Sequence, residues 1–111
     1  MRVGVLLALL AVLTGVRAQS ATVVGAVPEA FFLEPRDTLR VLRQPVIARA
    51  LKRLVGDSGA VLEIAFPGGE ASRLWAGELR DRLVALGLES GRIQLDPATG
   101  GAVGLVLRIR P

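Results

Sequence analysis

The chain has 111 residues, room for one domain, and a formal net charge of +4 at pH 7. It contains no Cys, no His and no Tyr. These absences exclude disulfides, a thiolate nucleophile, an imidazole base, a cysteine for lipid attachment and the common transition-metal sites.

An apolar leader opens the sequence. Arg2 supplies a positive charge, and residues 3–16 form an apolar run that Arg17 interrupts. Val16 and Ala18 place compact residues at the two positions that a signal peptidase reads before its cut. A membrane-spanning helix needs about 20 apolar residues, so an uncleaved anchor is the poorer alternative. We expect a signal peptide at residues 1–18 and a periplasmic or secreted product.

Removal of the leader changes the charge balance. It leaves 93 of the 111 residues, with 12 of the 14 basic and all 10 acidic side chains, so the net charge falls to +2. Lys52 is the only lysine. So small a net charge gives little reason to expect nucleic acid binding. We expect no nucleic acid partner, no cofactor, and no membrane contact except through the signal peptide before cleavage.

The first strand of the mature domain has two candidates. Residues 19–29 fit either a spacer or an edge strand, ahead of a small domain over residues 30–111. Residues 22–27 and residues 31–33 compete for the first strand. We favour residues 31–33, because they carry the larger apolar side chains and because Pro35 ends the segment.

Two amphipathic helices and three strands are expected after this point, while residues 37–44 fit no single class. Pro45 suits a first helical turn, and apolar residues then recur at three-to-four spacing up to Gly56. A second helix is expected over residues 70–86, with Gly87 as its stop. Its buried stripe is expected to be Leu79, Leu83 and Leu86. The remaining strands are expected at residues 60–66, 92–95 and 103–110, with a turn at residues 96–101.

The order of these elements is β-α-β-α-β-β. Helical crossovers imply parallel neighbouring strands with the helices on one face of the sheet. The short turn before the last strand instead predicts an antiparallel hairpin. The sequence therefore predicts an α/β fold, an α+β sandwich in which two helices pack on one face of a mixed sheet.

Four segments in this order carry a family resemblance. They read F-F-L-E-P at residues 31–35, A-R-A-L-K-R-L at residues 48–54, V-L-E-I at residues 61–64 and L-R-D-R-L-V-A-L-G-L-E-S-G-R-I at residues 79–93. Together they resemble the OmpA-like C-terminal domain family of bacterial envelopes. The resemblance implies the same fold and a place in the cell envelope.

The binding signature of that family is missing here. Its members bind the diaminopimelate of peptidoglycan through a Thr-Asp pair after the second strand and an arginine of an Arg-Ala pair on the second helix. In this chain Phe66 leads into Pro-Gly-Gly-Glu without an Asp, and Trp75-Ala76 stands where Arg-Ala would. The asparagine usual between them is absent too. The resemblance therefore argues against carrying the peptidoglycan site over.

Three constellations could carry chemistry, and each has a plainer interpretation. A Pro-Gly-Gly turn before the second helix could cradle an anion, but it matches no nucleotide-binding motif, and an ordinary turn explains it. Ser72 and Lys52 could form a catalytic dyad, yet no spacing brings them together. Glu63 on a central strand needs a cationic partner, and the last strand offers Arg108 and Arg110.

Trp75 is the only tryptophan, and two interpretations of it stay open. It could anchor a partner protein or a glycan, or it could be a core-boundary residue at the edge of the helix stripe. Arg73 and Glu70 precede it on the same helix. The three residues are the candidate partner-binding residues of the chain.

These observations favour an exported, non-enzymatic cell-envelope protein, a periplasmic binding domain or the subunit of an assembly. Its partner would be another envelope protein or a cell-wall component. The alternative is a degenerate OmpA-like domain that contacts peptidoglycan through non-standard residues. A small secreted hydrolase is a third hypothesis.

The leader generates a test of processing. Because residues 3–16 are too short to span a bilayer and Ala18 precedes a suitable cut, the exported protein should begin at Gln19 and be soluble. Intact-mass measurement of the periplasmic fraction checks this. A mass that retains residues 1–18, recovered with the membranes, would contradict it.

Overall fold

The computed structural model describes residues 20–98 and 104–111. The expected signal peptide at residues 1–18 lies outside the described residues, as do the end of the expected turn at residues 96–101 and Val103. Across the described ranges, no helix has both the length and the apolar character needed to cross a membrane.

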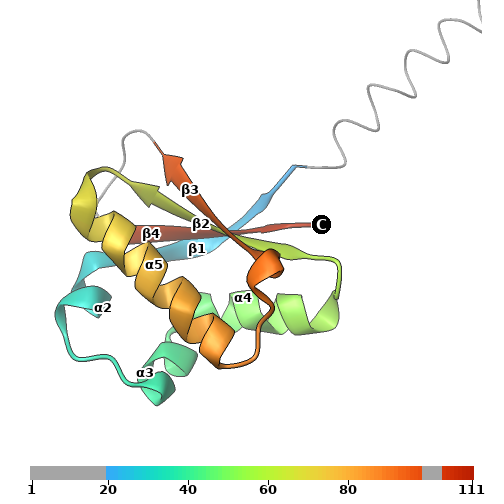
Figure 1. Ribbon diagram of the computed structural model, residues 1–111, viewed down its shortest axis with the longest axis horizontal. Coiled ribbons are helices and arrows are strands. Elements are labelled where there is room, and N and C mark those ends of the chain that lie inside the picture. Colours follow the sequence, from blue (N-terminus) through green and yellow to red (C-terminus); the bar gives the residue numbers. More distant parts are fainter. Residues whose placement is uncertain (1–19, 99–103) are drawn as a thin grey trace, which may run out of the picture.

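The strands form one mixed four-stranded sheet in the order β1-β4-β2-β3 (Figure 1). Their bounds are Thr22–Pro28 for β1, Val61–Pro67 for β2, Ile93–Ala98 for β3 and Gly104–Arg110 for β4. β4 runs antiparallel to β1 and to β2, whereas β2 and β3 are parallel. The helical crossover between β2 and β3 is therefore of the expected parallel kind.

Two expected strand pairs are wrong. The last two strands do not form a hairpin, because β4 inserts between β1 and β2 and does not lie beside β3. For the same reason β1 and β2 are not neighbours. The physical cause lies in the side chains of β4, where Leu105, Leu107 and Ile109 are all buried on one face. A strand with three buried side chains on one face is covered best from the middle of a sheet, where neighbours flank it on both sides.

The helices lie together on one side of the sheet (Figure 1). They are α2 (Glu29–Leu33), α3 (Thr38–Arg43), α4 (Pro45–Gly56) and α5 (Gly69–Ala85), and a 3₁₀ turn η1 (Ser90–Arg92) precedes β3. α4 packs on β1, β4 and β2, and α5 packs on β2, β4 and β3. The expected α/β class is confirmed, with a mixed sheet and its two long helices on one face.

The preferred first strand is also wrong. Residues 31–33 lie in the short helix α2, and the first strand is β1, within the segment that could equally have been a spacer. Both Phe31 and Phe32 are buried. Adjacent residues of a strand point to opposite faces, whereas one helical turn can direct both rings into the core. Glu29 in the first turn also suits the positive end of a helix.

The helix boundaries follow local capping. The Asp37 side chain accepts a hydrogen bond from the Arg40 N–H at 2.8 Å and starts α3 in the segment left ambiguous by the sequence. Gln44 ends α3, and its Oε1 accepts from the Ile47 N–H at 2.9 Å to start α4. After α5, Gly87 adopts φ of 110°, and the Leu88 N–H reaches the Leu83 carbonyl at 3.0 Å. This is the Schellman ending that the sequence predicts.

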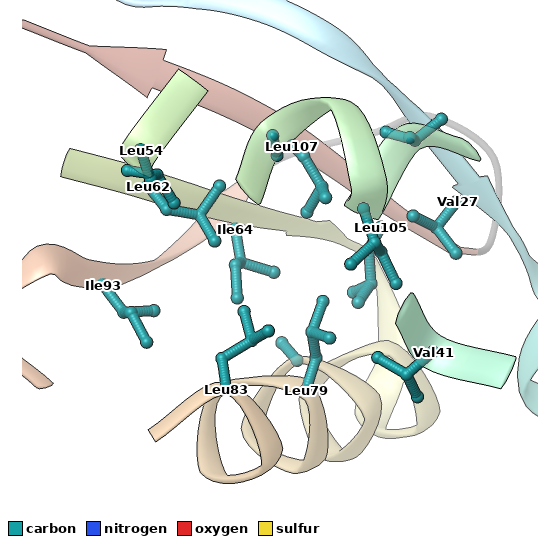
Figure 2. Packing of buried hydrophobic residues seen from close by; sticks show 14 of the residues in the cluster. Val27, Val41, Leu54, Leu62, Ile64, Leu79, Leu83, Ile93, Leu105 and Leu107 are labelled. Carbon is teal, nitrogen blue, oxygen red and sulfur yellow. The ribbon is translucent and has the colours of Figure 1, made fainter. Parts of the chain in front are cut away.

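The core fills the space between the sheet and the helices (Figure 2). Leu79 and Leu83 of α5 point from the helix towards the sheet, where Ile64 and Leu107 are opposite each other in the β2–β4 register. The stripe of α5 departs from expectation at its end, because Leu86 is 45% exposed. The buried positions of α5 are Ser72, Ala76, Leu79 and Leu83.

Arg36 fastens the segment after α2 to α5. Its Nε and Nη2 donate to the two carboxylate oxygens of Glu78, each at 2.8 Å, and its Nη1 donates to the carbonyls of Phe32 and Glu34. A bidentate pair of this kind is among the strongest side-chain ion pairs. The hydrogen bond from Arg36 lowers the pKa of the Glu78 carboxyl against the opposing effect of its partial burial, and the charge of Arg82 adds a smaller lowering.

Because of this pair, the stability of the domain should decrease as the pH becomes acidic. The pKa of Glu78 is lowered in the folded state, so its contribution is present above the ordinary glutamate pKa of about 4.3 and is lost as the pH falls through the folded pKa. Urea unfolding of wild type and Glu78→Gln should differ most at neutral pH, and the difference should shrink towards pH 3. A difference that stays constant with pH would refute the assignment.

Candidate functional site

Glu70 and Arg73 lie together beside a pocket at the carboxyl ends of β2 and β3. We name this the strand-end pocket; its volume is about 390 Å³, and it is lined by Phe66, Gly68, Gly69, Glu70, Arg73, Pro97 and Ala98. Gly68 and Gly69 have φ of 56° and 73°, a region that favours glycine, and they turn the chain from β2 into α5. Ligands often bind at such strand ends in open sheets.

The charges of the strand-end pocket offset one another. Arg73 Nη2 lies 2.7 Å from Glu70 Oε1, and both side chains are largely exposed. Glu70 also occupies the first turn of α5, where the helix dipole would otherwise attract an anion. The Pro-Gly-Gly segment therefore acts as a strand-to-helix turn, and the pocket presents a neutral ion pair.

Trp75, the third candidate residue, is held by a different contact. It is partly buried and stacks on Phe32 of α2, with ring centroids 4.9 Å apart and planes 9° from parallel. The guanidinium of Arg36 also lies over the Phe32 ring, 5.7 Å from its centroid. The contact of Trp75 is thus with α2, whose aromatic residues the sequence had suggested as a strand.

Ser72 and Lys52 do not come together. Ser72 of α5 is fully buried, and its hydroxyl accepts a hydrogen bond from the Gly104 N–H at 3.4 Å. Lys52 is exposed on α4. A buried serine engaged with the backbone is no nucleophile for a bound substrate, so the two residues form no dyad here, as their spacing in the sequence indicates.

The expected partners of Glu63 are confirmed on the open face of the sheet. Glu63 Oε1 lies 3.4 Å from Arg108 Nε, and Oε2 lies 3.8 Å from Arg110 Nη1. Arg108 also pairs with Asp96 of β3. The network ties β2, β4 and β3 together across the face opposite α4 and α5. In the described residues, no group of three His, Cys, Asp or Glu side chains is arranged to hold a metal ion.

Sequence reasoning missed an apolar groove on the helical side. We name it the helix-side groove; it has a volume of about 430 Å³ and is lined by Leu42, Leu51, Val55, Leu83, Leu86, Gly87, Leu88 and Arg92. Val55 is 87% exposed, Leu86 45% and Leu42 39%. The groove thus gathers aliphatic side chains from α3, α4 and the end of α5 that the core does not cover.

Arg92 braces one end of this groove. Its Nε donates to the Ala60 carbonyl at 3.0 Å, and its Nη2 donates to the carbonyls of Leu54 at 2.8 Å and Asp57 at 2.6 Å. These bonds fix the end of α4 against η1. The groove is therefore formed by side chains whose backbones are held in place.

A signal for the groove was present in the sequence. The apolar stripe of α4 is wider than the helix face that packs on the sheet. Leu51 and Val55 follow the fully buried Ala50 and Leu54 by one residue each. One residue further along a helix is a rotation of about 100°, which turns these two side chains away from the sheet. Such a broad stripe indicates a second contact surface.

No protein family, curated protein or solved structure matches the chain.

The stack of Trp75 on Phe32 generates a stability test. Trp75→Ala should lower the free energy of unfolding by about 3 kcal/mol, the low end of the range for large aromatic residues, because the indole is only partly buried. Its neighbour Leu74 is 58% exposed, so Leu74→Ala should stay within about 0.5 kcal/mol of wild type. Denaturant unfolding measures both. If Trp75→Ala unfolds like wild type, Trp75 is a surface residue free to bind a partner.

Proposed function

We propose that the chain is an exported, non-enzymatic cell-envelope protein whose mature domain binds another envelope protein through the helix-side groove. The groove is the observation that carries the proposal. Scattered apolar side chains are common on protein surfaces, but a group that shares one concave surface marks an interaction site. The signal peptide expected at residues 1–18 and the resemblance to the OmpA-like family support a place in the envelope.

The size of the groove bears on the strength of binding. Full burial of one Val or Leu side chain contributes about 1.5–3 kcal/mol; Val55 is largely available for it, whereas Leu42 and Leu86 are less than half exposed. The gain must offset the lost freedom of two associating molecules. Binding through this surface alone would therefore be weak, as suits a subunit held by several contacts or a transient partner.

The absence of reactive residue types supports a role without catalysis. The sequence has no Cys and no His. Ser72 is buried against the backbone, and Glu63 is engaged by two arginines. The pairing of Arg36 with Glu78 raises the pKa of Arg36 and lowers that of Glu78, and this ion pair joins two structural elements.

Site-specific photocrosslinking in the producing cell tests the proposed surface. A photoreactive amino acid at position 86 should give a discrete adduct with an envelope protein. The matched control is position 74 on the same helix, where Leu74 is equally apolar and 58% exposed but does not line the groove. No adduct from position 86, or equal adducts from both positions, would contradict the proposal.

The alternative, contact with peptidoglycan, has a separate test. In the sequence, the family's Asp after the second strand is absent, and Trp75 stands where its arginine would. Loss of one charged partner at such a site typically removes about 2–5 kcal/mol of binding. Purified sacculi should therefore leave the exported protein in the supernatant after sedimentation. Saturable, diaminopimelate-dependent cosedimentation would establish the alternative.

A further inference from the structure

We propose that the occupant of the helix-side groove is an acidic amphipathic helix of the partner protein, whose apolar side chains enter the groove while its carboxylates meet the basic residues around it. This inference rests on the proposed function and names the chemistry of its partner. The argument uses the charges beside the groove, its concave form and the composition of the chain's own helices.

Basic residues accompany the groove on α4, at the end of α5 and on η1. Lys52 lies one turn before Val55 on α4, and Arg82 lies one turn before Leu86 at the end of α5, so each shares a helix face with an exposed lining residue. Arg92 itself lines the groove. Among the described residues, none of these three basic residues forms a salt bridge, whereas Arg36, Arg40 and Arg73 each have a carboxylate partner.

The acidic residues nearby do not cancel this charge. Glu78, one turn before Arg82, is held by Arg36. Glu89 follows Leu88 and is the one acidic residue directly beside a lining residue in the sequence. α4, which carries Leu51 and Val55 of the groove, contains three basic residues and no acidic one, with Asp57 just after its end. The groove therefore has a positive surround that favours an acidic partner.

The same charge argues against a second copy of this chain. A symmetric dimer would place the groove of one copy on the groove of the other, and the basic residues beside them would repel. A lipid surface is also a poorer fit. A bilayer presents a flat boundary, whereas the groove is concave and takes its lining from three elements. A helix with apolar residues at three-to-four spacing can place a row of side chains into such a groove.

A designed peptide tests the inference on the purified exported protein. The probe is a fluorescent helix of about 18 residues, long enough to form in water, with leucines along one face and glutamates on both flanks. Its matched control carries lysines in place of the glutamates. Fluorescence anisotropy should show saturable binding of the glutamate peptide, at least about tenfold tighter than the lysine peptide, and weaker at high salt.

Two pairs of variants assign the binding to the groove. Val55→Asp should weaken binding of the glutamate peptide at least about tenfold, because it places a carboxylate among the apolar side chains, whereas Leu74→Asp should leave it unchanged. Lys52→Glu should weaken it as well, while Arg73→Glu beside the strand-end pocket should not. Val55, Lys52, Leu74 and Arg73 are exposed, so the variants should fold, and a thermal melt checks this.

The outcomes separate this inference from the proposed function. Equal binding of both peptides, or no binding of either, overturns the inference that the partner presents an acidic helix. Success of photocrosslinking at position 86 would still support the groove as a binding surface in that case. Binding that Val55→Asp leaves intact also overturns it. Groove-dependent binding to vesicles of phosphatidylglycerol, with no binding of the glutamate peptide, would replace the protein partner with an anionic membrane.

Discussion

The last strand holds the molecule together from the middle of the sheet. β4 pairs with β1 on one side and with β2 on the other. Its Leu105 and Leu107 are buried in the core between the sheet and the helices α4 and α5. On the opposite face Arg108 joins Glu63 and Asp96 of the flanking strands. The chain therefore cannot complete its core until its final residues are in place.

The central position of β4 also shapes the helical layer. α4 packs on β1, β4 and β2, while α5 packs on β4, β2 and β3, so the two long helices share the central strands but lie over different edges. α2 and α3 complete the core between them with Phe32 and Val41. Beyond this filling, α3, α4 and the end of α5 expose aliphatic side chains to a common groove. The proposed binding surface is thus a consequence of how the helices are spaced on the sheet.

Local patterns in the sequence predict most elements but not their pairing. Pro45, Gly87 and the periodicity between them predict both long helices, and Glu63 predicts its arginine partners. The order of strands depends on contacts between residues far apart in the chain, which periodicity does not encode, so the insertion of β4 was missed. Phe31 and Phe32 suggest a strand in isolation and form a helix, because one helical turn directs both rings into the core. The spacing of Leu86 continues the apolar stripe of Leu79 and Leu83, but the helix ends there in a Schellman turn, which leaves Leu86 at the surface.

The central place of β4 can be measured directly by nuclear Overhauser effects between backbone protons of the labelled exported protein. The account predicts contacts from Val106 to both Ala26 of β1 and Ala65 of β2, its partners in the two antiparallel registers. Contacts between β4 and β3, with none between Val106 and Ala26, would show a terminal hairpin. That result would contradict the sheet on which the core and the groove depend.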